Sequence, residues 1–208
     1  MDEKLDSKEE LYFKWFAEEL LAYEVITGFK YHPKPFILSP AMDFEVRNKT
    51  HPLSKVKVIS LLQGHEYTAD WILNWTPKLR GILWEPISSV HYENIKYFPF
   101  LANYSKEKDI YYSVIDVKGT FAGLHNTTAV TFPLNQKWVW ARYNVYINKV
   151  VTHPRVSKTG KNIPSNAIFP LTFVPERFLL TDKDMTERMI HYKKRTIAQY
   201  LIDVLQLK

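Results

Sequence analysis

The chain has 208 residues, a length that favours one domain with its own hydrophobic core. It contains no cysteine, so disulfides, thiolate zinc sites and cysteine nucleophiles are excluded. Lys and Arg number 28 against 22 for Asp and Glu, and the net charge of +6 suits a polyanionic partner. The first ten residues are acidic and polar, and no apolar run reaches the length of a membrane span. We therefore expect a soluble, cytoplasmic protein, cellular or phage-encoded, without membrane contact.

The first predicted element is a helix within residues 7–28. Ser7 and Glu10 have the spacing of a capping box, apolar residues then recur at helical intervals, and Gly28 is expected to end the helix. Residues 29–46 contain several prolines and are expected to form extended, edge-like segments. Residues 54–75 predict two strands that turn at Gln63 and Gly64, with Asp70 inside the second strand.

The second half predicts a strand, a helix and a strand in succession, at residues 109–121, 134–144 and 145–152. This order implies a parallel crossover and places Asp116 and Lys118 near one end of a central strand. Residues 76–109, rich in turn signals, look like an insertion between core strands. Residues 152–167 are expected to form a basic loop, and residues 168–208 a hairpin and a helix capped by Thr196. We expect one α/β domain over residues 1–208, with a mixed central β-sheet flanked by helices.

Three acids and one lysine occur in an order that suits phosphodiester hydrolysis: Glu10 on the first helix, Asp70 in a strand, and Asp116 with Lys118 in the next core strand. Two carboxylates from neighbouring strands can hold Mg²⁺, which prefers oxygen ligands. Residues two apart in a strand point to the same face, so Lys118 lies beside Asp116 and can orient or help deprotonate a water molecule.

These residues resemble the PD-(D/E)XK nuclease superfamily, with "YTADW" around Asp70 and "IDVKG" around Asp116 as the two half-motifs. "SKEELYF" resembles its acid-bearing first helix, and "NQKWVW" the helix after the lysine strand. The similarity covers residues 7–150 by order of elements and is greatest to phage-type and archaeal Holliday-junction resolvases. It implies a restriction-endonuclease-like fold, Mg²⁺ or substituting Mn²⁺, DNA products with 5′-phosphate and 3′-hydroxyl ends, and a homodimer acting on four-way junctions.

The resemblance also implies roles for particular residues. Those implied as metal ligands are Glu10, Asp70, Asp116 and the backbone carbonyl of Val117. Lys118 would position the attacking water, and Gln136 and Lys137 would assist. The chain departs from the usual pattern in having Asp116 where Glu is commoner, no Pro before Asp70, and a long gap between the two acids, which the insertion at 76–109 explains.

Each residue also has a structural interpretation. Glu10 can serve only as a helix cap, Asp70 can cap a turn or pair with Lys78 or Arg80, and Asp116 and Lys118 can form a salt bridge. A buried ion pair has little net stabilising value, which favours a site over a bridge. Gln136 and Lys137 can belong to an exposed helix face. The histidines lack metal-ligand spacing and are expected to be structural.

Two basic clusters are candidate DNA contacts: Arg155, Lys158 and Lys161 in the loop, and Lys193, Lys194 and Arg195 before the last helix. Charged loops can also be simply solvated. No phosphate-binding glycine motif is present, so no nucleotide cofactor is expected. Two alternatives remain: a nuclease of the same fold acting on another DNA substrate (restriction, repair or transposon-end type), and a non-catalytic basic DNA-binding or phage accessory protein.

Overall fold

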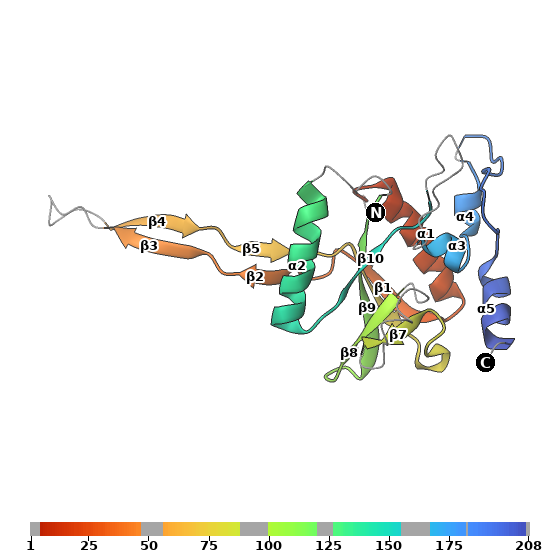
Figure 1. The fold of residues 1–208 in the computed structure, drawn as a ribbon, viewed down its shortest axis with the longest axis horizontal. Helices are drawn as coiled ribbons and strands as arrows, with labels where there is room; N and C mark the ends of the chain where they lie inside the picture. The colour runs from red at the N-terminus through yellow and green to blue at the C-terminus, as the bar shows by residue number, and fades with distance from the viewer. Residues whose placement is uncertain are drawn as a thin grey trace.

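The computed structural model describes residues 5–46, 56–87, 100–119, 127–154, 167–181 and 183–206. A mixed six-stranded sheet forms the centre of the molecule (Figure 1). Its strands, in spatial order, are β1 (Ile26–Tyr31), β6 (Trp71–Trp75), β9 (Ile110–Val117), β8 (Phe100–Ser105) and β7 (Trp84–Pro86), with β10 (Ile147–Val150) also paired to β9. The prediction of an α/β protein with a mixed central sheet is confirmed.

Strand β9 organises this sheet because it has partners along both sides. It pairs antiparallel with β6 on one side. On the other side its first half pairs antiparallel with β8 and its second half pairs in parallel with β10. Asn103 and Asn148 join the ends of β8 and β10, since their side-chain amides bond backbone groups of Tyr146 and Leu101 respectively. These amides replace ladder hydrogen bonds where the two strands meet.

Helix α1 (Lys8–Ala22) begins as predicted, with the Ser7 hydroxyl accepting a hydrogen bond from Glu10 N at 3.2 Å. The prediction that it ends at Gly28 is wrong. Val25 N bonds Leu20 O and Glu24 adopts a φ of 57°, so the chain turns directly after the helix and Gly28 lies in β1. The apolar residues between Tyr23 and Gly28 belong to a turn and a strand, which a helical pattern cannot distinguish over so few positions.

Helix α2 (Thr127–Tyr143) connects β9 to the parallel strand β10, as the order strand, helix, strand predicts. The helix begins well before the predicted residue 134 and contains Pro133. A proline within the first two turns removes only one interior hydrogen bond, so it does not prevent the earlier start.

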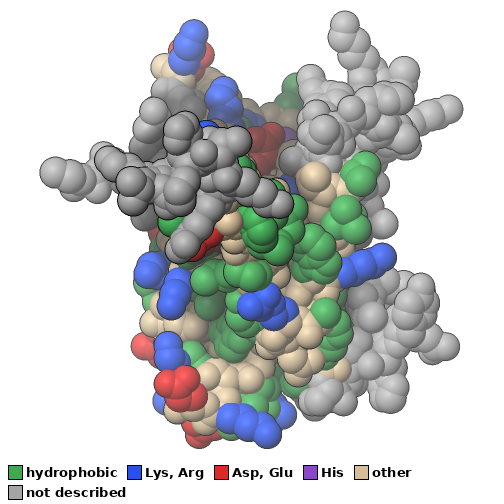
Figure 2. Space-filling model, turned by 90° about the vertical axis from the view of Figure 1, so that its left-hand side faces the viewer, with side chains coloured by type: hydrophobic (Ala, Val, Ile, Leu, Met, Phe, Trp, Pro, Cys, Tyr) green, Lys and Arg blue, Asp and Glu red, His purple; other side chains and the backbone are tan. Residues whose placement is uncertain are grey.

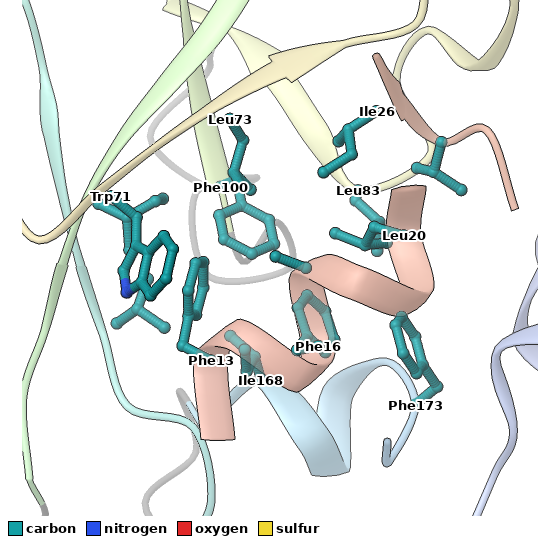
Figure 3. Close-up of a cluster of buried hydrophobic side chains, with 14 of the residues drawn as sticks. Phe13, Phe16, Leu20, Ile26, Trp71, Leu73, Leu83, Phe100, Ile168 and Phe173 are labelled. Atoms are coloured by element: carbon teal, nitrogen blue, oxygen red, sulfur yellow. The ribbon is translucent and has the colours of Figure 1, made fainter. Parts of the chain in front are cut away.

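The sheet buries one hydrophobic cluster on each face. On the α1 side, Phe13, Phe16 and Leu20 pack against Trp71, Leu73 and Phe100 of the sheet (Figure 3). The short helices α3 (Ile168–Leu171) and α4 (Glu176–Leu179) close this side, and Phe16 and Phe173 stack with ring centroids 4.4 Å apart. On the opposite face, Phe132 and Val139 of α2 cover Val114 and Ile147. The central sheet is therefore held between α1 and α2.

Residues 36–46 and 56–67 form an arm that projects from the body between β1 and β6 (Figure 1). Its base pairs β2 (Phe36–Ser39) with β5 (His65–Tyr67), and its outer part pairs β3 (Met42–Val46) with β4 (Lys57–Leu62). The predicted turn at Gln63 and Gly64 is wrong, because β4 and β5 follow one another along the same side of the arm.

Residues 76–109 include the 3₁₀ helix η1 (Pro77–Leu79), and their strands β7 and β8 extend the central sheet rather than standing outside it. In the described part of the C-terminal segment, the predicted hairpin is represented by one bridge, between Leu180 and Glu187. Helix α5 (Ile197–Gln206) follows its predicted cap, Thr196, whose hydroxyl accepts from Gln199 N at 3.3 Å. Among the described residues, every helix is too short or too polar to cross a bilayer.

Candidate active site

Asp70 and Asp116 come together at one end of the central sheet. Asp70 directly precedes β6 rather than lying inside it, and Trp71 of β6 is opposite Ile115 of β9 in the antiparallel register. This register places Asp70 beside Asp116 on the same face, although 46 residues separate them in the chain. Asp70 Oδ2 also accepts a hydrogen bond from Val117 N at 2.6 Å.

The surroundings of the Asp70 carboxylate disfavour its charged form. The pKa of Asp70 is raised to about 7, first by burial and then by the negative charge of Asp116, while the Val117 N–H and Lys118 act in the opposite direction. Asp116 is itself buried, with 3% of its surface exposed. Such a carboxylate pair favours a bound cation or a shared proton.

Lys118, just beyond the end of β9, forms an ion pair with Asp116 Oδ1. Its side chain is 19% exposed and its ammonium lies 5.6 Å from the centre of the Phe132 ring. The backbone N of Lys118 bonds Val150 O at 2.8 Å, which fixes the chain where the lysine leaves the sheet. The salt bridge that the sequence offered as an alternative is thus present, and it holds the lysine beside the acid pair.

Glu10 acts as a cap and also lies near the acids. Its carboxylate accepts hydrogen bonds from the Ser7 hydroxyl at 2.8 Å and from the Tyr31 hydroxyl at 2.6 Å. Glu10 is 7% exposed, and its charge contributes to the raised pKa of Asp70. The first turn of α1 also approaches the residue that follows Lys118, because Glu9 lies next to Gly119.

Within the described ranges, the side chains close enough to share one ion are Asp6, Glu10 and His32, whose candidate ligand atoms lie within 4.8 Å of one another. Asp70 and Asp116 are not in this set, although His32 N bonds Asp70 O at 2.9 Å. Sequence reasoning missed Asp6 and His32. The cap at Ser7 could have drawn attention to Asp6, but nothing local indicates that His32 folds back onto α1.

Tyr67 is the other residue that the sequence did not single out. Its hydroxyl donates a hydrogen bond to Asp116 Oδ2, and the tyrosine is 8% exposed. Burial, followed by the charge of Asp116, raises its pKa, so the hydroxyl keeps its proton. No local pattern could reveal this contact, because the two residues are 49 positions apart.

The remaining predicted residues have other surroundings. The Gln136 amide donates to Ile147 O at 2.6 Å and so ties α2 to β10, and Lys137 is exposed. Lys193 is exposed, Lys194 pairs with Glu187, and the Arg195 guanidinium bonds Thr172 O and Asp203. The three loop cations, Arg155, Lys158 and Lys161, lie outside the described residues.

The donor set of Asp70 and Asp116 fits a hard cation. Both ligands are carboxylates, and each keeps one oxygen in a fixed hydrogen bond, Asp70 with Val117 N and Asp116 with Tyr67. Outer hydrogen bonds of this kind orient metal-ligating carboxylates in proteins. Oxygen donors alone suit Mg²⁺ or Mn²⁺. Glu10 and the Val117 carbonyl are the further oxygen donors that the sequence assigned to this ion.

Comparison with known proteins identified no matching family model, no matching curated protein and no matching solved structure.

Proposed function

We propose that this chain is a metal-dependent DNA endonuclease of the PD-(D/E)XK type, acting on branched DNA such as a four-way junction as a homodimer. One observation carries the proposal: Asp70, Asp116 and Lys118, which the sequence motif selected, meet at one end of β9. The order helix α1, strands β1, β6 and β9, helix α2 and parallel strand β10 supports a restriction-endonuclease-like fold.

In the proposed reaction, water attacks the phosphorus of a phosphodiester and the bond to the 3′-oxygen breaks, giving 5′-phosphate and 3′-hydroxyl ends. Asp70 and Asp116 would hold Mg²⁺, with Glu10 and the Val117 carbonyl as further donors. When bound, the ion supplies positive charge that stabilises the phosphorane-like transition state. Lys118 would orient the attacking water and help to balance the negative charge that develops on the phosphate.

A groove beside the arm supports DNA as the partner. The groove has a volume of 530 Å³, and Ile72, Asn74, Tyr112 and Val114 are among its lining residues. These four side chains belong to the same alternating rows of β6 and β9 as Asp70 and Asp116. The charged residues around it are Lys30, Lys34, Lys108 and Glu107, so the groove is positive on balance. A phosphate backbone following it would lead along the sheet toward the acid pair.

The test is cleavage of labelled four-way-junction, flapped and linear DNA, with Mg²⁺ and with chelator. We expect cutting of the junction by the wild type, and a loss of at least about 100-fold in Asp116→Asn and Lys118→Ala, because each removes a group from the reacting centre. Lys183→Ala and Asp184→Ala are matched controls, since both side chains are exposed in a turn before α5. Circular dichroism would verify that all four variants fold.

The outcomes separate the candidate functions. Metal-dependent cutting of every substrate alike keeps the nuclease and rejects the preference for branched DNA. DNA binding without cleavage, unchanged in Asp116→Asn and Lys118→Ala, would favour the non-catalytic DNA-binding protein, for which the buried Asp116–Lys118 ion pair is only structural.

A further inference from the structure

Tyr67 connects the arm to the acid pair. It is the last residue of β5, at the base of the arm, and its cross-strand neighbour is Phe36 of β2. Its ring packs in the same hydrophobic cluster as Val114, which lies two residues before Asp116 on the same face of β9. Phe36 and Val114 therefore help to fix the position of the phenol ring, and the hydroxyl extends from this ring to the Asp116 carboxylate.

The two oxygens of the Asp116 carboxylate have different surroundings: within the part of the chain that the structure describes, Oδ2 accepts a hydrogen bond, whereas Oδ1 has an ion pair but no hydrogen bond. Tyr67 donates to Oδ2, and Lys118 pairs with Oδ1. Asp116 is 3% exposed, so water has little access to the carboxylate and cannot readily replace a lost hydrogen bond. Without the tyrosine hydroxyl, Oδ2 would lose its hydrogen bond and the carboxylate could rotate toward the ammonium of Lys118.

We propose that Tyr67 is a positioning residue, which holds the Asp116 carboxylate in the orientation that binds the divalent cation. This inference rests on the proposed metal-dependent function. The tyrosine does not touch the reacting atoms. It acts through Asp116, and outer hydrogen bonds of this kind change metal affinity by about 10- to 100-fold.

Helix α2 bonds both strands at the base of the arm and so helps to fix the position of Tyr67. Arg142 donates to Leu38 O at 2.9 Å and the Tyr143 hydroxyl donates to Ile37 O at 2.8 Å, both in β2. His65, in the same strand as Tyr67, bonds Asn135 of α2 at 2.9 Å. These contacts fix the base of the arm to the body, so the position of Tyr67 does not depend on its own hydrogen bond.

The experiment compares the wild type with Tyr67→Phe, which removes only the hydroxyl and keeps the ring. Tyr192→Phe is the matched control: its hydroxyl is also buried, but among the described residues it has no hydrogen-bond partner, and the ring packs in the hydrophobic cluster on the opposite, α1 side of the sheet. Mn²⁺ binding to the DNA-free protein would be measured by electron paramagnetic resonance or calorimetry. The Mg²⁺ concentration for half-maximal cleavage would be measured in parallel.

We expect Tyr67→Phe to weaken Mn²⁺ binding about 10-fold or more and to raise the Mg²⁺ requirement by a similar factor. Tyr192→Phe should leave both values unchanged. Wild-type Mn²⁺ affinity in Tyr67→Phe would overturn the inference while leaving the nuclease intact, as would a lower melting temperature alone. Tighter Mn²⁺ binding would also overturn it, because the hydroxyl would then compete with the ion. If the wild type neither binds Mn²⁺ nor cleaves DNA, the proposed function and this inference both fail.

Discussion

Asp70 and Asp116 lie side by side where water is scarce, and this arrangement has an energetic cost when no cation is present. Burial and the neighbouring carboxylate raise the pKa of Asp70 to about 7. In an unfolded chain the same carboxyl titrates near its ordinary value of about 4. Between these two values the folded protein binds a proton that the unfolded chain has already lost. The contribution of Asp70 to the free energy of unfolding is therefore fully present below about pH 4, and it is lost as the pH rises toward 7.

We predict that Asp70→Asn stabilises the metal-free protein at pH 8 by about 2 kcal/mol, since it removes a repelled buried charge. The amide oxygen can still accept the hydrogen bond from Val117 N. At pH 5 the gain should be much smaller, because Asp70 is then largely protonated. Denaturant unfolding at both pH values with chelator would measure this difference.

Asp43→Asn is the control for this prediction, because Asp43 is exposed on the arm and should show no such dependence on pH. An equal effect of Asp70→Asn at pH 5 and pH 8 would contradict the prediction, and so would destabilisation at pH 8.

The residues of the site illustrate what a sequence can and cannot reveal at this scale. Asp116 and Lys118 could be predicted because they stand two residues apart where one strand ends, and therefore share a face. Glu10 could be found through its capping box with Ser7, which the structure confirms. Tyr67 and His32 could not, because their partners come from distant segments and only the sheet register brings them together.

At the scale of elements, the helix α1, the strand β9 and the crossover to β10 were predictable from local patterns. The arm was not. Apolar and polar residues alternate along its strands in a way that fits several strand pairings. Gln63 and Gly64 look like a hairpin turn, although the chain continues past them in the same direction. The pairing of β3 with β4 and of β2 with β5 depends on contacts across the whole arm, which no short window contains.

The rows of β6 and β9 that end in Asp70 and Asp116 also line the groove, and this relation leads to a prediction about DNA binding. Replacing Lys34 and Lys108 together by Gln should weaken binding and reduce the slope of log affinity against log salt by about 2, one for each lost phosphate contact. Fluorescence anisotropy across a salt series, with chelator to prevent cleavage, would give the slope.

The matched control is Lys183→Gln, which removes an exposed lysine outside the groove. Its salt slope should equal that of the wild type after correction for the change in the net charge of the protein. A salt slope equal to that of the wild type in the Lys34 and Lys108 double variant would rule out the groove as a path for the phosphate backbone.

At the scale of the whole molecule, the arm is the feature that a single chain does not explain. Every residue of β3 and β4 is exposed, including Phe44 at 55% and Ile59 at 39%, which face each other across the ribbon. A two-stranded ribbon is only marginally stable alone in water. The charged residues of β3 and β4 are Asp43, Glu45 and Lys57, so these strands do not suit a polyanion.

The side of the molecule from which the arm projects has an apolar centre. Figure 2 looks onto this side and shows hydrophobic side chains gathered in the middle with Lys and Arg around them. Helix α2, which lies beside the base of the arm in Figure 1, also exposes Val130, Leu134 and Trp138, with exposed fractions of 66%, 53% and 51%. Exposed apolar surface of this kind marks a protein interface. A second copy of the chain supplies the same apolar surface, and two active sites related by a two-fold axis would match the symmetry of a four-way junction.

We therefore predict that the protein is a dimer at micromolar concentration and that Phe44→Ser with Ile59→Ser makes it monomeric. The reason is that the apolar face of the arm would lose its two central side chains. The body should keep its melting temperature, because the arm packs against it through Leu38 and Tyr67 at its base, which these substitutions leave unchanged. Sedimentation and light scattering would measure the mass. The control, Asp43→Ser with Glu45→Ser, changes the opposite face of the same strand and should remain dimeric. A wild-type protein that stays monomeric at all concentrations would exclude the arm as a dimer interface, and a junction would then have to be cut one strand at a time by single subunits.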